Sequence, residues 1–355
     1  MKKQKNFLKK FIRRYLSSSS SFFYNLHPYP KCLPYNINWD KNESFWSKIL
    51  GNEKIQVIDV GARDFSLEEL QSLKKSIDLI CFEAEKDEAH RLQSKLNTDF
   101  HRVRVFGLFI GKTDMKEKEF YLYKRLAESS SFEPSQNYVD EFDTDLAIGE
   151  KISVNETTLE NIALKNSLNP DLIKLDTQGS ELDILIGSKE VINECLIIET
   201  EVEFMEMYAG QPLFHDISSF LYDRDFQLLY LNRVFKSRNV PNIGDTRGQI
   251  VFGDALFGLS FEKAKKLSNS KKFKYCCLLI NYGIIDFAYK LFFSDKNLKE
   301  EYPELNFYFK KLEFNQRGIF GAIKRLTKLA ISGLIGISFI FIHKIIKTNG
   351  IIMDS

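Results

Sequence analysis

Short apolar runs alternate with amphipathic stretches from residue 55 onward, and this alternation constrains the fold more than any other feature of the chain. Uninterrupted apolar runs are typical of strands buried on both faces, and a period near 3.6 residues indicates helices. Strands are predicted over 55–60, 79–82, 102–110, 119–124, 172–175, 196–198, 228–231 and 249–256, the last one closing the sheet. Helices are predicted over 67–76, 86–96, 181–187 and 213–223, and a loop able to cover a pocket over 125–152. The pattern predicts an α/β fold with a mostly parallel, doubly wound sheet.

The ends of the chain are basic and its middle is acidic. Of the total charge of +2, residues 1–39 contribute +8 and residues 314–355 contribute +5, which leaves −11 for residues 40–313. Nucleic-acid-binding proteins usually carry positive charge on the folded domain, so this distribution argues against nucleic acid. It favours ends that meet an anionic lipid surface.

Each end carries a segment suited to a lipid interface. Residues 1–16 interleave apolar and basic residues at helical spacing, which predicts an amphipathic interfacial helix or, equally, a disordered basic tail. Residues 329–342 carry no charge but fall short of the roughly 20 residues that span a bilayer. We expect residues 329–346 to form a peripheral anchor, with a short spanning helix or a buried helix as alternatives. The expected organisation is a basic tail and linker (1–39), a main domain (40–260), a helical extension (261–318) and a membrane-associating segment (319–355).

The cysteines and histidines show no metal-binding pattern. The chain has five cysteines, an odd number without CxxC spacing, and its five histidines form no ligand pair. We therefore expect reduced thiols, no metal site and a cytoplasmic protein that sits peripherally on the inner face of the membrane.

Polar residues follow the first two predicted strands, where ligands bind in an open α/β sheet. Asp59, Gly61 and Ala62 end the first strand, and a glycine there lets the backbone approach a ligand or simply makes a turn. The helix expected next would offer free N–H groups to an anion. Glu83 ends the second strand, where a carboxylate can accept hydrogen bonds from both hydroxyls of a ribose. The alternative is that Glu83 is an ordinary acidic residue on the surface.

Asp176 opens a third segment of this kind. It stands in the run Lys-Leu-Asp-Thr-Gln-Gly-Ser-Glu over 174–181, where a strand, an acid and a glycine again meet a helix start. We expect Asp176 at the centre of the sheet's edge, beside the reacting atoms. Gly179 and Ser180 also suit an ordinary helix start, with Ser180 as the N-cap.

These three segments together resemble the FkbM family of S-adenosylmethionine-dependent methyltransferases. The resemblance covers about residues 50–260, including the run over 201–214, and is most specific over 174–182. It implies a Rossmann-like sheet of seven strands, S-adenosylmethionine as cofactor, and O-methylation of a sugar hydroxyl in a glycan or secondary metabolite. It also implies that Asp59 and Gly61 lie in the cofactor motif and that Glu83 is the ribose-binding acid.

A sugar hydroxyl needs a base to take its proton. Glu199, Glu201 and Glu203 alternate along a strand and should face one way, so that each raises the pKa of the others. Glu201 is the preferred base and His215 its rival, while a solvated strand end remains the alternative.

The first loop departs from the family pattern. Family members often have Asn and a further Gly where this chain has Arg63 and Phe65, and the Phe65 side chain should hinder the closest backbone approach to a cofactor. The leading prediction is an O-methyltransferase acting on a glycan or glycolipid. The alternatives are a catalytically inactive Rossmann-like binding module at a membrane and an NAD-dependent oxidoreductase. The last is disfavoured because the loop lacks GxGxxG spacing.

Overall fold

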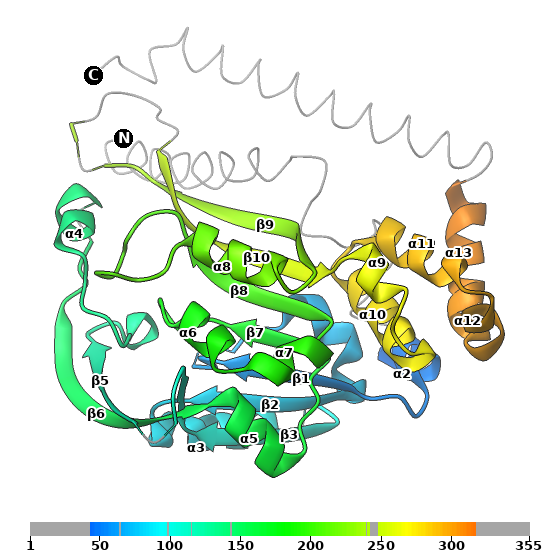
Figure 1. Ribbon diagram of the computed structural model, residues 1–355, viewed down its shortest axis with the longest axis horizontal. Coiled ribbons are helices and arrows are strands. Elements are labelled where there is room, and N and C mark those ends of the chain that lie inside the picture. The colour runs from blue at the N-terminus through cyan, green and yellow to red at the C-terminus, as the bar shows by residue number, and fades with distance from the viewer. Residues whose placement is uncertain are drawn as a thin grey trace, which may run out of the picture.

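The computed structural model describes residues 43–316, apart from residues 64, 98, 115, 143, 239 and 242–247. Within them, seven strands form a central sheet in the order β3 (Arg102–Gly107), β2 (Ile77–Glu83), β1 (Ile55–Val60), β7 (Leu172–Leu175), β8 (Ile197–Glu203), β10 (Gln249–Leu259) and β9 (Phe226–Lys236) (Figure 1). The pairs from β3 to β8 are parallel, and β10 is antiparallel to both of its neighbours. The predicted mostly parallel α/β sheet is confirmed.

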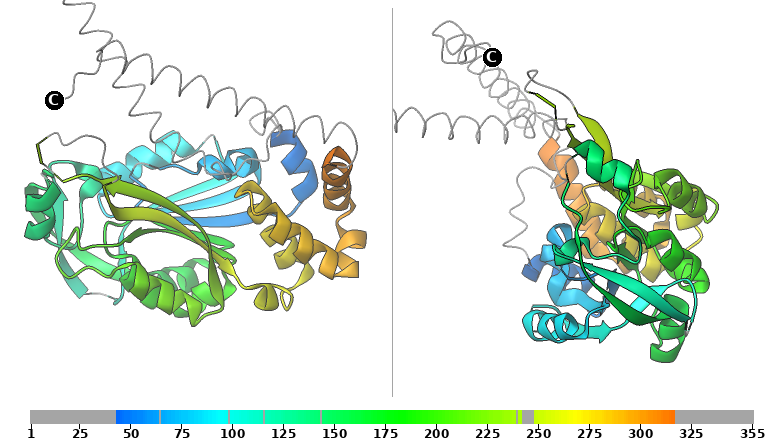
Figure 2. Two further views of the ribbon diagram at one scale, coloured as in Figure 1. Left: turned by 90° about the horizontal axis from the view of Figure 1, so that it is seen from above. Right: turned by 90° about the vertical axis from the view of Figure 1, so that its left-hand side faces the viewer.

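Helices cover both faces of this sheet (Figure 2). The 3-10 helix η2 (Glu68–Ser76) and α3 (Lys86–Leu96) lie on one face, and α2 (Glu43–Leu50) packs against η2. The other face carries α5 (Leu159–Asn166), α6 (Glu181–Ile186), α7 (Lys189–Glu194) and α8 (Phe214–Tyr222). The helix predicted over 67–76 is present as this 3-10 helix, which begins seven residues after Gly61.

A second, three-stranded sheet corrects two of the sequence predictions. The run over 102–110 is not one strand: the chain leaves the large sheet after Gly107, and β4 (Phe109–Gly111) pairs with β6 (Ile148–Thr158) beside β5 (Lys116–Tyr123). The predicted loop over 125–152 contains α4 (Gln136–Phe142) and the start of β6. Tyr138 and Phe142 of α4, four residues apart, bury their rings in a small core that also contains Tyr121 and Tyr123 of β5.

The end of the large sheet also differs from the prediction. We expected the strand from Gln249 to close the sheet, but β10 lies inside it and β9 forms the edge. The two strands make a long antiparallel pair, and β10 is buried along most of its length whereas β9 alternates between exposed and partly buried residues. The more apolar strand takes the inner position, where both faces are covered.

The helical region after the sheet belongs to the same hydrophobic core. It comprises α9 (Phe261–Ala264), α10 (Asn269–Asn281), α11 (Ile285–Ser294), α12 (Lys296–Glu301) and α13 (Pro303–Gln316). Residues such as Phe273, Leu291 and Phe309 are fully buried in one cluster with the sheet. Figure 1 shows α10 at one end of the large sheet and the small sheet with β5 and β6 at the other.

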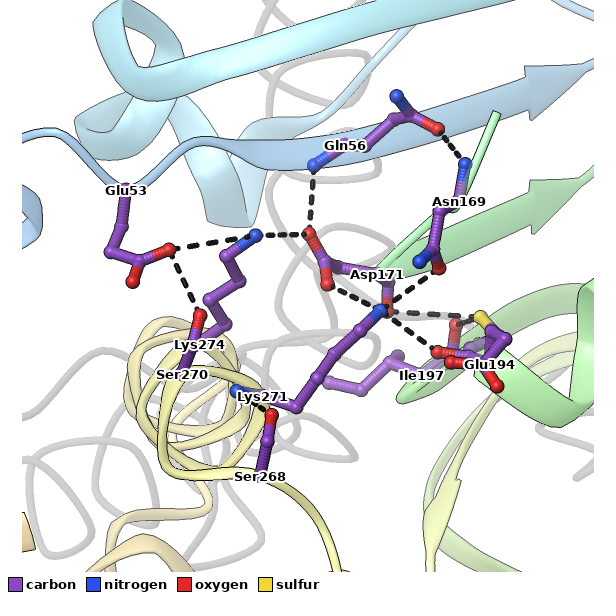
Figure 3. Close-up of polar contacts among 11 residues, drawn as sticks. Glu53, Gln56, Asn169, Asp171, Glu194, Ile197, Ser268, Ser270, Lys271 and Lys274 are labelled. Carbon is purple, nitrogen blue, oxygen red and sulfur yellow. Dashed lines mark hydrogen bonds and ion pairs between the residues drawn. The ribbon is translucent and has the colours of Figure 1, made fainter. Parts of the chain in front are cut away.

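An ionic cluster fixes α10 to the sheet (Figure 3). Asp171, just before β7, is 1% exposed, and its carboxylate contacts the ammonium groups of Lys271 at 3.0 Å and Lys274 at 3.3 Å. It also accepts a hydrogen bond from the Gln56 backbone at 3.0 Å. Two lysines one helical turn apart thus bind a single buried anion at the amino end of the strands.

Within the described part of the chain, no helix combines the length and the apolar character needed to cross a membrane. The segments predicted to meet lipid, 1–16 and 329–346, lie outside the described residues.

Candidate active site

A cleft opens at the carboxyl ends of β1, β2 and β7. The space between its walls is about 560 Å³, its open mouth included. Its lining combines polar strand ends with apolar residues of β4, β5 and the turn Leu126–Glu128, and comprises Val60, Gly61, Arg63, Phe82, Glu83, Ala84, Leu108, Phe109, Ile110, Phe120, Leu126, Ala127, Ser129, Asp176, Thr177 and Gln178. Three predicted site residues, Gly61, Glu83 and Asp176, therefore meet in one cavity, part of whose wall comes from the predicted loop.

Gly61 brings two strand ends into direct contact. Its φ of +83° is in the left-handed region, and a Cβ atom there would lie 1.9 Å from the carbonyl oxygen of Asp176. Ala62 follows, fully buried beneath the cleft, and its N–H donates to the Phe82 carbonyl at 3.2 Å. Only glycine allows the loops after β1 and β7 to approach this closely.

Glu83 is held in the wall of the cleft by contacts with Arg63 and Glu85. Its Oε1 accepts a hydrogen bond from the Glu85 backbone at 3.1 Å and lies 3.5 Å from the Arg63 guanidinium, which also contacts Glu85. Burial raises the pKa of Glu83, and the Glu85 N–H and Arg63 oppose this. Arg63, noted in the sequence only as a departure, is thus a partner of the predicted ribose-binding acid.

Phe65 points away from the cleft. Its ring packs edge-to-face on Phe100, with the ring centroids 5.6 Å apart, and it is not among the residues that line the cavity. The expected obstruction by this side chain therefore does not arise from its position here.

Asp59 belongs to a charged row on one face of the sheet, below the cleft. Asp59, Lys174 and Glu199 are register neighbours on β1, β7 and β8, and we call them the buried row. The Lys174 ammonium lies 3.7 Å from Asp59 and 3.8 Å from Asp176, which lines the cleft. Asp59 is fully buried, and burial raises its pKa against the opposing effect of Lys174.

The buried row holds its lysine charged. Burial lowers the pKa of Lys174, but the negative charges of Asp59, Asp176 and Glu199 outweigh this effect and raise it. Burial raises the pKa of Glu199 to about 7, against the hydrogen bond from Tyr282 and the charge of Lys174. The sequence motif contains Lys174, but nothing in the sequence indicates its link to Glu199.

The turn after β7 is shaped by Glu181 rather than by Ser180. The buried Glu181 carboxylate accepts hydrogen bonds from the Thr177 N–H at 2.7 Å, the Thr177 hydroxyl at 2.9 Å and the Gly179 N–H at 2.9 Å. Ser180, predicted as the N-cap, makes no capping hydrogen bond, and its hydroxyl instead contacts the Ser131 hydroxyl at 2.8 Å. The acid four residues after Thr177 thus orders the whole turn.

Gln178 joins two carboxylates across the edge of the cleft. Its φ is +56°, and its side-chain amide donates to Asp176 at 3.1 Å and to Glu201 at 2.6 Å. Its side-chain oxygen accepts from the Tyr208 hydroxyl at 2.9 Å, and its backbone carbonyl accepts from the Ser130 hydroxyl at 2.6 Å. Four contacts hold Gln178 in a strained conformation that aims its amide at both acids.

The three glutamates of β8 face one side but occupy different environments. Glu199 bonds to Tyr282, Glu201 is partly buried beside Gln178, and Glu203 is fully buried. Burial, followed by the charges of Asp176 and Glu203, raises the pKa of Glu201 well above its usual range. Glu201 does not line the cavity itself and reaches its edge through Gln178.

His215 stands apart from these groups. Its side chain is 76% exposed at the start of α8, and its Nε2 lies 3.4 Å from Asp216. It is not among the cleft-lining residues. In the described part of the chain, His, Cys, Asp and Glu form no group of three or more that could hold a metal ion.

Comparison with known families agrees with this arrangement. Residues 59–228 match the Methyltransferase FkbM domain, a segment that begins at Asp59 and contains Gly61, Glu83, Asp176 and Glu201. The matching segment makes up just under half of the chain. The resemblance seen in the sequence is thereby confirmed over these residues.

A curated relative and two solved structures are similar to the chain. The 2-O-methyltransferase NoeI of Sinorhizobium fredii is 27% identical over 170 residues, which cover 44% of this chain and 66% of that protein, just under two thirds of its length. Magnesium protoporphyrin IX methyltransferase of Synechocystis with bound S-adenosylmethionine has 11% identity and a TM-score of 0.32, covering 71% of this chain and 97% of that one. TrmK of M. capricolum with S-adenosylhomocysteine has 10% identity and a TM-score of 0.30, covering 76% and 94%. These scores are too low to bear on the site.

Proposed function

We propose that the chain is an S-adenosylmethionine-dependent O-methyltransferase that acts on a sugar hydroxyl of a glycan or glycolipid. The observation that carries the proposal is the meeting of Gly61, Glu83 and Asp176 in one cleft of an FkbM methyltransferase domain. A relative that methylates an oxygen, NoeI, supports O-methylation.

The residues of the cleft fit this cofactor. The apolar part of the lining, which includes Phe82, Phe109 and Phe120, suits the flat, largely apolar adenine ring. Glu83 lies where its carboxylate can accept hydrogen bonds from ribose hydroxyls. Gly61 keeps the floor of the cleft free of side-chain atoms, and Asp176 offers a half-exposed carboxylate beside it.

The chain's own task in the reaction is to orient a hydroxyl and to take its proton. When bound, the cofactor would supply an electrophilic methyl group on a sulfonium, a good leaving group because it departs as a neutral thioether. Asp176 can orient the attacking hydroxyl at the cleft, and Glu201, fixed by Gln178, accepts the proton that the hydroxyl loses. The high pKa of Glu201 makes its carboxylate a strong base once it is ionised.

The test is a titration of the full-length chain with S-adenosylmethionine, followed by transfer of a labelled methyl group to a panel of oligosaccharides and glycolipids. Micromolar binding and labelling of an acceptor oxygen support the proposal. Glu83→Gln should weaken binding about tenfold or more, since it removes a carboxylate from the ribose position. A folded wild-type chain that binds no S-adenosylmethionine at millimolar concentration contradicts the proposed function.

The ion pairs of Arg63 favour one competing function. Arg63 contacts both Glu83 and Glu85, so the predicted ribose-binding acid already has a cationic partner. A catalytically inactive binding module would keep such a pair closed. Because a closed pair keeps Glu83 from a ribose, a folded chain that neither binds the cofactor nor methylates any acceptor would favour this alternative.

We further propose that the enzyme works at a membrane surface through residues 1–16 and 329–346. Their basic and apolar composition supports this role, and the net charge of −11 between the ends argues that the body does not itself bind anionic lipid. The full-length chain should bind vesicles that contain anionic lipid, and high salt should release an electrostatic contact but not an inserted one. A full-length chain that does not bind anionic vesicles at low salt contradicts the proposal.

A further inference from the structure

The helical extension places one residue against the buried row. Tyr282 follows the last residue of α10 and is 7% exposed, and its hydroxyl donates a hydrogen bond to Glu199 Oε2 at 2.5 Å. It lies outside the segment that matches the FkbM domain, residues 59–228. The contact therefore joins a part of the chain beyond the family match to the site.

The position of this hydroxyl is fixed at both ends of α10. At the start of the helix, Lys271 and Lys274 bind the buried Asp171 carboxylate (Figure 3). Beside Tyr282, the Asn281 side chain accepts a hydrogen bond from the Ser72 hydroxyl of η2 at 2.6 Å. The helix cannot slide along the sheet without breaking one of these contacts, so it delivers the Tyr282 hydroxyl to one place.

Glu199 is otherwise surrounded by a cation and several anions. The charged groups that face it are Lys174 on β7, Asp254 on β10 and Glu69 on η2, in addition to the Tyr282 hydroxyl just after α10. Two of these three charged neighbours are acids, which disfavour a negative charge on Glu199. The tyrosine hydroxyl favours it, because it donates to the carboxylate.

We propose that Tyr282 is a positioning residue that keeps Glu199 ionised beside Lys174 and thereby sets the charge beneath the cofactor cleft. The inference rests on the proposed function. When Glu199 is a carboxylate, it shares the charge of Lys174 with Asp59 and Asp176. When Glu199 takes a proton, one of these negative charges is lost and the positive charge of Lys174 is less fully balanced. The Lys174 ammonium lies 3.8 Å from Asp176, which lines the cleft.

This charge matters because of what the cleft is proposed to hold. S-Adenosylmethionine carries a sulfonium, an ammonium and one carboxylate, so it has one net positive charge, whereas its product S-adenosylhomocysteine has none. Added positive charge beneath the cleft should weaken binding of the cofactor more than binding of the product. Comparing the affinities of the two ligands thus separates an electrostatic effect from a general distortion of the cleft.

The experiment is a calorimetric titration of the full-length chain with each ligand, from about pH 6 to about pH 9, for the wild type and Tyr282→Phe. In the wild type, cofactor affinity should fall as the pH is lowered through the titration of Glu199. In Tyr282→Phe this fall should move to higher pH, so that affinity near pH 7 drops about three- to tenfold. The affinity for S-adenosylhomocysteine should change less in both.

Two variants separate this role from a loss of structure. Tyr275→Phe removes a buried tyrosine hydroxyl within α10 that donates to the Leu259 carbonyl at 2.8 Å instead of to the buried row. It should leave the pH profile unchanged. Glu199→Gln should bind the cofactor weakly at every pH, and Tyr282→Phe should add nothing to it. An unchanged profile in Tyr282→Phe overturns the inference alone, while a wild type that binds neither ligand contradicts the proposed function as well.

Discussion

The Glu181 carboxylate folds back onto Thr177, four residues earlier, and accepts hydrogen bonds from both its N–H and its hydroxyl. This contact, with a third bond from the Gly179 N–H, explains why an acid ends the run over 174–181. The turn it holds carries Gln178, whose amide reaches Asp176 and Glu201. One buried carboxylate therefore orders the catalytic edge of the proposed site.

Glu181→Gln should disorder this turn. A glutamine has one oxygen and an amide donor that meets N–H groups, so at least one buried donor loses its partner, at a cost of about 1–3 kcal/mol. We expect a lower free energy of unfolding in urea and at least tenfold weaker cofactor binding. Glu160→Ala is the control: it removes a carboxylate that accepts hydrogen bonds from the Glu190 and Val191 backbones and does not line the cleft, so cofactor affinity should stay unchanged.

Gly61 and Gly51 form a matched pair of glycines. Both have positive φ, +83° and +56°, so alanine strains the backbone at either position. An added Cβ lies 1.9 Å from the Asp176 carbonyl at Gly61, whereas it meets nothing within 4 Å at Gly51. Gly61→Ala should abolish cofactor binding and destabilise the chain more than Gly51→Ala, which should cost about 1 kcal/mol and still bind. Equal binding by the two variants would argue against a cofactor at this loop.

The strand ends could be found from the sequence because each is a local signal. Asp59, Glu83 and Asp176 directly follow apolar runs, and in a parallel sheet such residues share one edge. The three segments over 59–62, 82–84 and 173–182 also carry the family resemblance. Together they were sufficient to predict the sheet and the location of the cleft.

The remaining contacts depend on distances along the chain that no local pattern encodes. Tyr282 lies 83 residues from Glu199, and Gln178 lies 48 residues from Ser130. The small sheet escaped prediction because β4 is only three residues long and pairs with a strand that begins 37 residues after it. Arg63 was noted only as a departure from the family, since its acidic partners follow a different strand.

The Asp171 carboxylate should contribute more to the free energy of unfolding than an exposed ion pair does. Asp171→Ala leaves Lys271 and Lys274 facing each other without their shared anion, and the loss of one partner of a buried pair costs about 3–5 kcal/mol. Glu262→Ala removes an acid that pairs with Lys265 on the surface, where the cost is about 0–1 kcal/mol. Urea unfolding of both variants measures the difference. Similar midpoints would show that the cluster in Figure 3 does not hold α10 to the sheet.

The raised pKa of Glu199 predicts how the free energy of unfolding depends on pH. Its pKa of about 7 in the fold lies above the ordinary 4.5, so between these values the folded chain binds more protons at this site than the unfolded chain. The contribution, on the order of 3 kcal/mol, is therefore full below about pH 4.5 and is lost as the pH rises through about 7. Glu199→Gln should remove this part of the slope. Urea unfolding of both proteins at about pH 5 and about pH 8 provides the test, and parallel pH profiles would contradict the assignment.

Glu201 and His215 can be separated as bases once an acceptor is known. Glu201 is fixed by Gln178 beside Asp176, whereas His215 is 76% exposed and outside the cavity. Because the pKa of Glu201 is raised well above its usual range, the rate of methyl transfer should increase with pH as this group ionises. Glu201→Gln should lower the rate about 10²- to 10⁴-fold, abolish this increase and leave cofactor affinity nearly unchanged. His215→Asn should retain both the rate of methyl transfer and its pH profile. The opposite pattern in the two variants would identify His215 as the base.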